Sequence, residues 1–323
     1  MLRTLTGLIA VLASHPATAD TPRYPDLPAP ISSFGAAVVG DYVYVYGGHA
    51  GKAHNYSTET TLGEFRRLDL KKPDKWEDLP GGPKLQGLVL VAHKDKLYRI
   101  GGMQPQNGKT EKSDTKSLAT CAVYDPAAGK WSDIEPLPEP RSSHDSAVLG
   151  DTLYVFGGWR LNGKDGKSEW YAHGWSLDLD EPGAKWNKID QPFQRRALTM
   201  AAHNGHVYVI GGLNAKGGME LAANRYDPKS QSWSDGPVIP GEKSNGFTPA
   251  TAVADGRLFV TPADGKIYRL SGTADRWEEC AKLKEARFVA RMVAGPEHKL
   301  VVVAGATPAG SLAGLEAVEP GKQ

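Results

Sequence analysis

A run of aromatic and β-branched residues followed by two glycines occurs four times in this chain, at nearly even spacing. The copies read YVYVYGG, KLYRIGG, TLYVFGG and HVYVIGG, and their first glycines lie at positions 47, 101, 157 and 211. The steps between them are 54, 56 and 54 residues. A unit that repeats at a fixed period and cannot bury its own apolar face must stack on copies of itself. The fold therefore depends on how many copies the chain contains and how they close.

Each repeat predicts a small antiparallel sheet. The second one runs GLVLVAHKDKLYRIGG, then a long polar stretch, then TCAVYDPAAGKWSDIEPLP. Short apolar runs separated by turn sequences such as NG, GD and DP predict a meander of four strands, which we call a to d. The glycine pair ends strand b, where the backbone can bend without a Cβ in the way. A tryptophan opens strand d, seven residues after a tyrosine, as Trp131 follows Tyr124.

The glycine pair, the tyrosine and the tryptophan seven residues later resemble the kelch repeat of β-propellers. Five tryptophans mark five d strands: Trp76, Trp131, Trp186, Trp233 and Trp277. The first and third repeats depart from the pattern at the tyrosine position, where Leu68 and either Leu177 or Leu179 stand. The resemblance covers almost all of the chain and implies an all-β fold, a six-bladed kelch-type β-propeller.

The sixth blade lacks an outer strand at the C-terminal end of the chain. ARMVAGPEHKLVVVAGA followed by GLEAVEP supplies strands a to c only. At the other end, PRYPDLPAP resembles DKWEDLPGG of the first blade, with Tyr24 in the place of the tryptophan. We therefore expect the N-terminal strand to close the last blade and remove the free sheet edges. The expected blades span about 31–80, 84–138, 141–190, 195–240, 246–282, and 287–320 plus 22–30.

Residues 1–19 are typical of a signal peptide. Arg3 precedes a short apolar run, and Ala17-Thr18-Ala19 gives the small-x-small pattern that a signal peptidase cuts. The apolar run is too short to span a bilayer. We therefore expect residues 20–323 to form a single propeller domain that is exported to a periplasm or to the extracellular space.

The charge balance argues against two classes of partner. Removal of Arg3 from the 38 basic residues leaves 37 of them against 37 acidic residues. Proteins that bind nucleic acids or anionic membranes generally do so through an excess of Lys and Arg. We expect a monomer with no nucleic-acid partner and no membrane insertion.

The candidate site lies on the face that carries the long loops between strands b and c. In the first four blades these loops span roughly 49–63, 103–119, 159–172 and 213–221. Strand a begins with Arg141 in blade three and with Arg195 and Arg196 in blade four, and Arg287 lies near the same point of blade six. Arginines around a channel mouth would bind a carboxylate bidentately. Alternatively, each would bond to carbonyl groups of a neighbouring blade.

The long loops add aromatic residues. Trp159, Trp170 and Tyr171 lie in the third-blade loop, and His49 and Tyr56 lie in the first-blade loop. Exposed aromatic rings beside hydrogen-bonding groups suit a sugar ring or a protein partner. The alternative is that these rings only pack the loops against the blades.

Two classes of propeller enzyme are disfavoured by the sequence. Cys121 and Cys280 are not placed for the copper centre of galactose oxidase relatives, and the Asp-box motif of sialidases is absent. We expect no metal and no cofactor, because no histidine pair or carboxylate set has ligand spacing.

The predicted function is an exported binding module for a glycan or a protein, acting through the long-loop face. The alternative follows from a resemblance to exported bacterial kelch propellers that include N-acetylneuraminate mutarotases, which implies a sugar epimerase acting on a small acidic sugar. Arg141, Arg195 and Arg287 would then hold the carboxylate, and His144 or Glu169 would transfer the proton. The sequence leaves open whether the protein is an enzyme.

Overall fold

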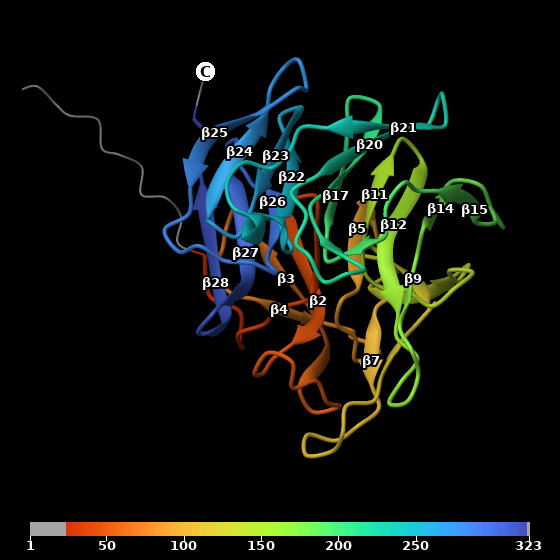
Figure 1. Ribbon diagram of the computed structural model, residues 1–323. Helices are drawn as coiled ribbons and strands as arrows, with labels where there is room; N and C mark the ends of the chain where they lie inside the picture. The colour runs from red at the N-terminus through yellow and green to blue at the C-terminus, as the bar shows by residue number, and fades with distance from the viewer. Residues whose placement is uncertain (1–23, 322–323) are drawn as a thin grey trace, which may run out of the picture.

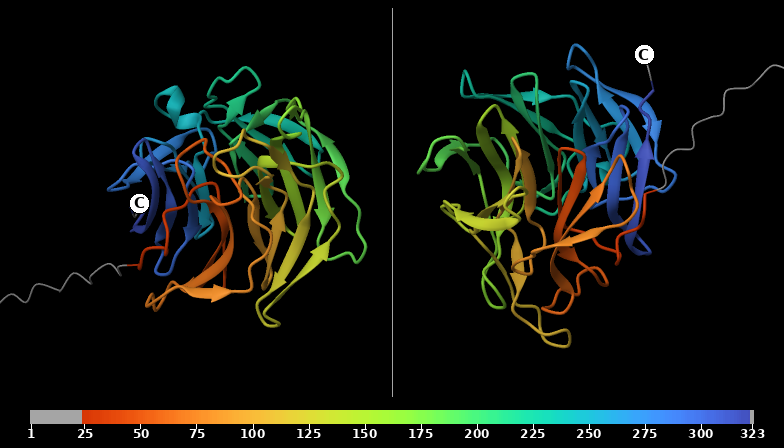
Figure 2. Two further views of the ribbon diagram at one scale, coloured as in Figure 1. Left: turned by 90° about the horizontal axis from the view of Figure 1, so that it is seen from below. Right: turned by 180° about the vertical axis from the view of Figure 1, so that it is seen from behind.

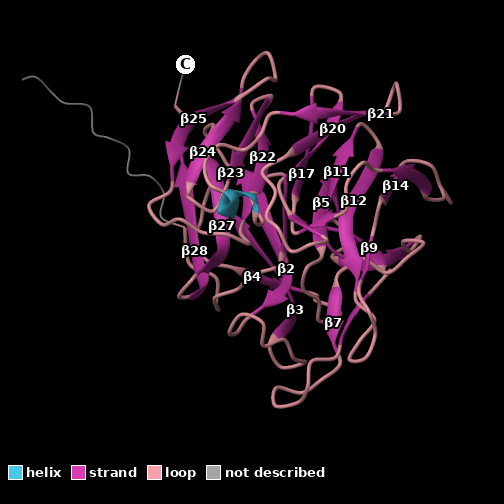
Figure 3. Ribbon diagram, in the orientation of Figure 1, coloured by secondary structure: helices cyan, strands magenta, loops and turns pink. Residues whose placement is uncertain are grey.

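The computed structural model describes residues 24–321, which form a ring of six antiparallel sheets around a central axis (Figures 1 and 2). Neighbouring inner strands contact one another all the way round, including β26 (Arg291–Ala294) of the last blade against β1 (Gly35–Val39) of the first. The predicted all-β, six-bladed propeller is therefore confirmed. The described residues include one short 3₁₀ helix, η1 (Lys243–Gly246), and none of their helices is long and apolar enough to cross a membrane (Figure 3).

The blades follow the chain in order, and the strands of each blade run from the axis outward. Blade one comprises β1, β2 (Tyr42–His49), β3 (Thr61–Asp69) and β4 (Glu77–Leu79). Blade two comprises β5 (Val89–His93), β6 (Lys96–Ile100), β9 (Cys121–Asp125) and β10 (Lys130–Ile134). Blade three comprises β11 (Ser142–Leu149), β12 (Thr152–Arg160), β14 (His173–Asp178) and β15 (Asn187–Asp190), with β13 (Glu169–Trp170) paired to the end of β12.

The remaining blades keep the same order. Blade four comprises β17 (Thr199–His203), β18 (His206–Ile210), β20 (Ala223–Asp227) and β21 (Ser232–Gly236). Blade five comprises β22 (Ala250–Ala254), β23 (Arg257–Thr261), β24 (Lys266–Leu270) and β25 (Trp277–Lys282). Blade six comprises β26, β27 (Leu300–Thr307) and β28 (Gly310–Val318). Two short strand pairs lie in the loops, β7 (Met103–Pro105) with β8 (Thr115–Ser117) and β16 (Arg195–Arg196) with β19 (Leu213–Asn214).

Six apolar clusters fill the spaces between neighbouring blades. Between blades one and two, Tyr44, Phe65 and Tyr124 are buried, and the ring of Trp131 lies 5.0 Å from that of Phe65. Successive residues of a strand point to opposite faces, so each blade contributes to the clusters on both of its sides. An isolated blade would expose both faces, which explains why the unit is repeated around a closed ring.

The glycine pair lets neighbouring blades approach closely. Gly47 and Gly48 have φ angles of 63° and 104°, which favour glycine. A Cβ on Gly47 would lie 2.5 Å from the carbonyl oxygen of Leu85 in the next blade, and a Cβ on Gly48 would lie 2.9 Å from that of Ser32. Both the backbone conformation and the available space therefore require the repeated glycines.

The N-terminal segment forms the outer edge of blade six, as predicted. The amide of Leu27 donates to the carbonyl of Ala313 in β28 at 2.9 Å, and the red segment meets β28 in Figure 1. The indole of Trp76 donates to the carbonyl of Pro25 at 3.1 Å. The other four d-strand tryptophans likewise donate to a carbonyl at the outer edge of the preceding blade. These bonds show that residues 24–31 take the place of a fourth strand.

The register differs from the sequence prediction at Tyr24. The Trp131 indole donates to the carbonyl of Pro80, which lies four residues after the tryptophan of its own blade, Trp76. The Trp76 indole donates to the carbonyl of Pro25, so the position equivalent to the tryptophan in the N-terminal segment is residue 21. Residue 21 is outside the described residues. Tyr24 packs instead in the cluster between blades six and one, where its hydroxyl donates to the carbonyl of Leu70 at 3.4 Å. Tyr24 therefore does not replace the tryptophan, because the true register is shifted by three residues.

Candidate functional site

Six residues at the long-loop end of the channel, one from each blade, have a left-handed backbone. They are Ser33, Gly87, Ser143, Ala197, Thr248 and Val289, with φ between 46° and 58°. Amide-to-carbonyl hydrogen bonds of 2.8 to 2.9 Å join the first five in order around the axis, from Gly87 donating to Ser33 up to Thr248 donating to Ala197. We call these six residues the mouth ring. Its members hold the six blades together at the point where the channel opens.

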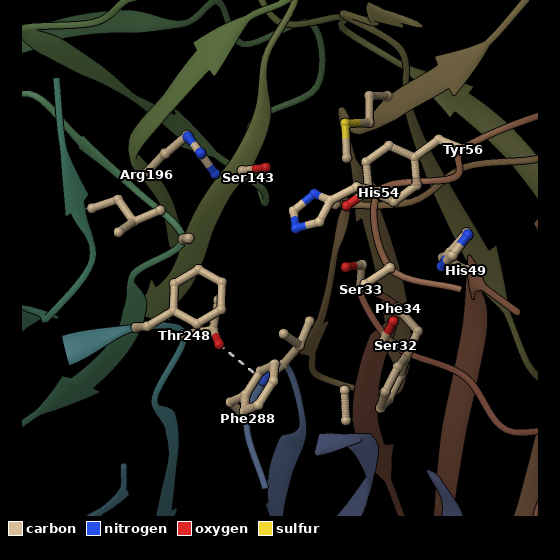
Figure 4. A pocket seen from close by; sticks show the side chains of 18 of the residues that line it. Ser32, Ser33, Phe34, His49, His54, Tyr56, Ser143, Arg196, Thr248 and Phe288 are labelled. Atoms are coloured by element: carbon tan, nitrogen blue, oxygen red, sulfur yellow. Dashed lines mark hydrogen bonds between the residues drawn. The ribbon is translucent and has the colours of Figure 1, made fainter. Parts of the chain in front are cut away.

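The mouth ring surrounds a cavity of about 940 Å³ that is lined by residues of all six blades. Figure 4 shows Arg196, Ser143, His54 and Thr248 around the same open space. The volume lies near the upper end of the range, about 300 to 1,000 Å³, that is usual for small-molecule sites. The channel mouth can therefore enclose a ligand rather than only touch one.

The long loops of blades one to three raise one side of this cavity. The amide of Thr58 donates to the carbonyl of Asn107 at 3.0 Å, and the amide of Lys164 donates to the carboxylate of Asp114 at 3.0 Å. These contacts join the three loops into one wall. In blade five, only residues 262–265 separate β23 from β24, so the wall is low on that side.

The floor of the cavity is an ion pair across the axis. Arg291 in β26 donates through Nη1 to both carboxylate oxygens of Asp145 in β11, at 3.1 and 3.2 Å. Its other nitrogens donate to the carbonyls of Phe34 and Leu88. Asp145 also accepts the amide of Met200 at 2.9 Å. The pair thus joins five of the six blades, and its Arg291 lines the cavity.

Arg196 presents a guanidinium to the cavity without an acidic partner. Consecutive residues of a strand point to opposite sides, so Arg195 faces the blade and Arg196 faces the cavity. The guanidinium carbon of Arg196 lies 4.0 Å from the centre of the Trp159 ring and 5.5 Å from that of Trp170. Within residues 24–321 its side chain has neither a hydrogen bond nor an ion pair, and burial lowers its pKa. A stacked, partly desolvated guanidinium of this kind favours a carboxylate ligand.

Two histidines and a tyrosine of the first blade line the side of the cavity opposite Arg196 (Figure 4). The ring of Tyr56 packs edge-on against His49 at 4.9 Å and lies 6.2 Å from His54. Burial lowers the pKa of His49 and raises that of Tyr56, while the charge of Arg196 acts on Tyr56 in the opposite direction. These groups supply hydrogen-bond donors and acceptors, and Tyr56 and His54 can also exchange protons with a ligand.

His144 lies at the edge of the cavity floor. Its ring is buried, and neither ring nitrogen has a hydrogen-bond partner among the described residues. Burial, reinforced by the charges of Arg141 and Arg291, holds its pKa well below the usual range. His144 is therefore neutral near pH 7, and as a predicted proton-transfer group it would be a weak base.

The other three predicted arginines lie buried within their own blades, outside the cavity lining. Arg141 donates to the carbonyls of Gly157 at 2.6 Å and His173 at 3.0 Å. Arg195 and Arg287 make the corresponding bonds in blades four and six. The structure therefore does not assemble the predicted carboxylate clamp. These arginines bond to carbonyl groups, in agreement with the alternative prediction, but the carbonyls belong to their own blade and not to a neighbouring blade.

The third-blade loop also differs from its predicted role. The Glu169 side chain is 55% exposed, lies 3.9 Å from Arg160 and does not line the cavity. Tyr171 is buried over the guanidinium of Arg141 at 4.1 Å, where its hydroxyl donates to the carbonyl of Pro140. Trp170 lies behind Trp159, with ring centres 5.5 Å apart. Of this loop, Trp159 is the predicted aromatic residue that reaches the cavity.

Sequence reasoning missed Arg291 and Asp145. Asp145 lies four residues after Arg141, and Arg291 lies four residues after Arg287, so the two occupy the same repeat position in opposite blades. That position is Gly35 in blade one and Val89 in blade two. Alignment of the repeats would have shown two opposite charges at an inward position that is uncharged in the other four blades.

Among the described residues, one group of side chains has metal-ligand chemistry, and it lies on the face opposite the cavity. His93, Asp151 and Asp180 bring ligand atoms within 4.8 Å of one another. The ammonium of Lys94 pairs with both carboxylates, and the His93 ring is 3.2 Å from Asp180. These contacts form an ion network between blades two and three, and this network accounts for the cluster. Cys121 and Cys280 are free thiols.

The chain is similar to known propeller proteins. A family model described as the KLHDC2/KLHL20/DRC7 Kelch-repeats domain matches residues 33–261 and, in a second placement, 90–305. The N-acetylneuraminate epimerase of Haemophilus influenzae (strain 86-028NP) is 27% identical, with 83% of this chain and 80% of that protein covered.

Two further comparisons are a sequence match to a longer protein and a superposition on a solved structure. Kelch-like protein 35 of Mus musculus is 25% identical over 84% of this chain, which spans only 40% of that longer protein. The solved structure of YjhT superposes with a TM-score of 0.72 over 92% of this chain and 97% of that chain, at 16% identity, which shows a shared fold.

Proposed function

The chain belongs to the kelch-repeat family, and from that premise we propose that it binds a small acidic sugar in the cavity within the mouth ring. The observation that carries the proposal is the Arg196 guanidinium, stacked on Trp159 at 4.0 Å and without an acidic partner among the described residues. A carboxylate there would gain a charge-assisted, bidentate hydrogen bond in a partly dry site. Hydroxyl groups of Ser33, Ser143 and Tyr56 would face the rest of the ligand.

A protein partner has less support from this geometry. A protein-binding face is expected to be broad, with aromatic anchors exposed at its centre. In this propeller Tyr171 is buried, and Trp170 is half-buried with its ring against that of Trp159. The large apolar side chains that are exposed in the described residues are Met219, Val238 and Val253, and none is aromatic.

The binding proposal is tested by saturation-transfer NMR with N-acetylneuraminate as the probe. We expect transfer to the wild-type protein and at least a tenfold loss of affinity in Arg196→Gln. Arg160→Gln is the matched control, because Arg160 carries the same charge on the same rim but is 40% exposed and pairs with Glu169. The proposal fails if the wild-type protein gives no transfer, or if Arg196→Gln binds as well as the control.

A second candidate function is catalysis of anomer interconversion of the bound sugar. It is favoured by the presence of His54 and Tyr56 in the same cavity as Arg196, and by the epimerase relatives. Ring opening and closure need one group that donates a proton and one that accepts it. Freshly dissolved α-N-acetylneuraminate should then reach anomeric equilibrium faster than in buffer. Tyr56→Phe should slow this reaction while saturation transfer persists, and an unaccelerated wild-type reaction would remove the enzyme candidate.

We also propose that the protein acts after export. The support is the signal-peptide pattern of residues 1–19, which lies outside the described residues. Intact-mass measurement of the protein recovered outside the cytoplasm tests this proposal. The expected mass is that of a chain starting at Asp20, and a full-length mass would contradict it.

A further inference from the structure

The mouth ring changes its bonding at its last two members. Between Ser33 and Thr248, each member donates its amide to the carbonyl of the one before. The amide of Val289 donates instead to the side-chain Oγ1 of Thr248 at 2.9 Å, the dashed line in Figure 4. No hydrogen bond joins Val289 to Ser33 within residues 24–321. The ring is therefore open between blades six and one.

The last two members of the mouth ring, which lead up to this break, also have strained backbones. Thr248 has φ 46° and Val289 has φ 53°, although both are β-branched. Left-handed backbone is a genuine outlier for β-branched residues, whereas the other four members are glycine, serine or alanine. Strain of this kind is retained where the surrounding structure enforces it, and it concentrates at ligand-binding sites.

The break leaves unpaired polar groups in residues that line the cavity. By the pattern of the ring, the amide of Ser33 points toward blade six, and the carbonyl of Val289 points toward blade one. Neither has a hydrogen-bond partner in the described part of the chain. The hydroxyl of Thr248 accepts a bond from Val289, and its own proton has no acceptor there. The cavity wall thus offers two donors and one acceptor, and all three residues line the cavity.

A ligand hydroxyl matches this arrangement. A hydroxyl group both donates and accepts hydrogen bonds, so it can accept from the amide of Ser33 and donate to the carbonyl of Val289. A carboxylate would meet the Val289 carbonyl with no proton to offer. An apolar group would leave all three polar groups unsatisfied, which is costly in a partly buried site.

We propose that the break between Val289 and Ser33 is a subsite for a ligand hydroxyl, with Thr248 as an additional donor. The inference rests on the proposed function and deepens it, because it assigns one hydroxyl group of the acidic sugar to a named part of the cavity wall. The carboxylate of this sugar lies at Arg196, and a hydroxyl-bearing carbon lies against blades five, six and one. Figure 4 shows Arg196 on one side of the cavity and Ser33 and Phe288 on another.

The test uses two probes and two variants at one position. The probes are N-acetylneuraminate and cyclohexanecarboxylate, which share a carboxylate but differ in hydroxyl groups. Thr248→Val keeps the β-branch and removes the hydroxyl, so it should weaken N-acetylneuraminate binding about tenfold and leave cyclohexanecarboxylate binding within twofold. Thr248→Ser restores the hydroxyl and should bind both probes like the wild-type protein. Equal losses for both probes, or no loss for either, would overturn the subsite.

A second measurement uses the wild-type protein alone. Saturation with N-acetylneuraminate should move the amide proton signal of Ser33 downfield, because the amide gains an acceptor, and cyclohexanecarboxylate should not. An unchanged Ser33 signal under bound N-acetylneuraminate would reject the subsite but leave the carboxylate site at Arg196 intact. Absence of binding by both probes would instead reject the proposed function, and the subsite with it.

Discussion

The guanidinium of Arg291 in blade six donates hydrogen bonds to both carboxylate oxygens of Asp145 in blade three, at 3.1 and 3.2 Å, across the axis of the ring. The Asp145 side chain is 4% exposed and that of Arg291 is 24% exposed. The partners are 146 residues apart in the sequence and lie in opposite blades. The pair therefore forms only when the ring is closed, and it marks the base of the cavity.

Loss of either partner should destabilise the ring strongly. Asp145→Asn leaves the Arg291 charge without its counter-ion, and we expect a loss of about 3 kcal/mol in the free energy of unfolding. Arg291→Gln should cost a similar amount. The double variant should fall short of the sum by about 1 to 2 kcal/mol, because the two residues interact directly. Urea denaturation measures all four proteins.

An exposed pair provides the control for this cycle. Arg66 and Asp78 form an ion pair at 2.6 Å on the outside of blade one, where the Asp78 side chain is 81% exposed. The corresponding cycle should give a coupling below about 1 kcal/mol. Equal coupling in the two cycles would show that the pair on the axis is no more important than a surface contact.

The buried arginine of blade four should not tolerate lysine. Arg195 donates to the carbonyls of Gly211 and Ala222 and to the side chain of Asn224. A lysine cannot reproduce this planar set, and we expect Arg195→Lys to cost about 2 kcal/mol of unfolding free energy. Burial already lowers the pKa of Arg195 to about 10, so the same burial would also disfavour the charged lysine. Denaturant titration measures the effect.

A neighbouring arginine of the same blade is the matched control for that substitution. Arg225 makes one exposed hydrogen bond, to Ser234 at 3.2 Å, so Arg225→Lys should change stability by less than about 0.5 kcal/mol. Equal losses at the two positions would contradict the structural role assigned to Arg195. Selective loss of ligand binding in a fully stable Arg195→Lys protein would restore the carboxylate-clamp hypothesis.

Acid should destabilise the protein through His144. In the unfolded chain this histidine takes up a proton below its ordinary pKa of about 6.5, whereas burial in the folded protein holds its pKa well below that value. The unfolded state therefore binds more protons as the pH falls below 6.5, and the free energy of unfolding decreases, by at most about 1.4 kcal/mol per pH unit from this residue. His144→Gln should flatten that slope in denaturation series from pH 7.5 to 5. An identical slope in the variant would show that His144 becomes protonated in the folded state.

Loss of the hydrogen bond between Trp76 and the N-terminal segment should loosen that segment, whereas loss of the equivalent bond between blades one and two should not. Trp76→Phe removes the hydrogen bond to the carbonyl of Pro25, with an expected cost of about 1 kcal/mol. Backbone amides of residues 24–31 should then exchange hydrogen faster. Trp131→Phe removes the equivalent bond to Pro80 and should leave that segment as protected as in the wild-type protein. Unchanged exchange in Trp76→Phe would show that the Pro25 contact does not anchor the segment.

The repeat made the fold predictable because its signals are steric. Gly47 is required by the approach of the next blade and Gly48 by the inner strand of its own blade, so the glycine pair reports a contact between blades as well as a local bend. The tryptophan spacing predicted closure by the N-terminal segment. It did not fix the register at Tyr24, because a single nine-residue match without its own tryptophan allows a shift of three positions.

The site was harder to predict because it depends on which way adjacent side chains point. Arg195 and Arg196 are equivalent in the sequence, yet only the two-residue strand β16 decides that the first bonds within the blade and the second faces the cavity. Arg291 and Asp145 meet only through closure of the ring. The break in the mouth ring is the absence of a backbone hydrogen bond between Val289 and Ser33 in the described residues, which no residue pattern indicates.

Blade six is assembled from two segments that lie far apart in the sequence. Its outer edge comes from residues 24–31 and its inner three strands lie between residues 291 and 318. Blades one to five consist of consecutive segments, so each can form its sheet without the far end of the chain. The N-terminal segment must wait for β28, and pairing over so long a separation is slow. A nascent chain halted before β28 would therefore remain an open arc with an unpaired strand edge, ready to pair with another chain.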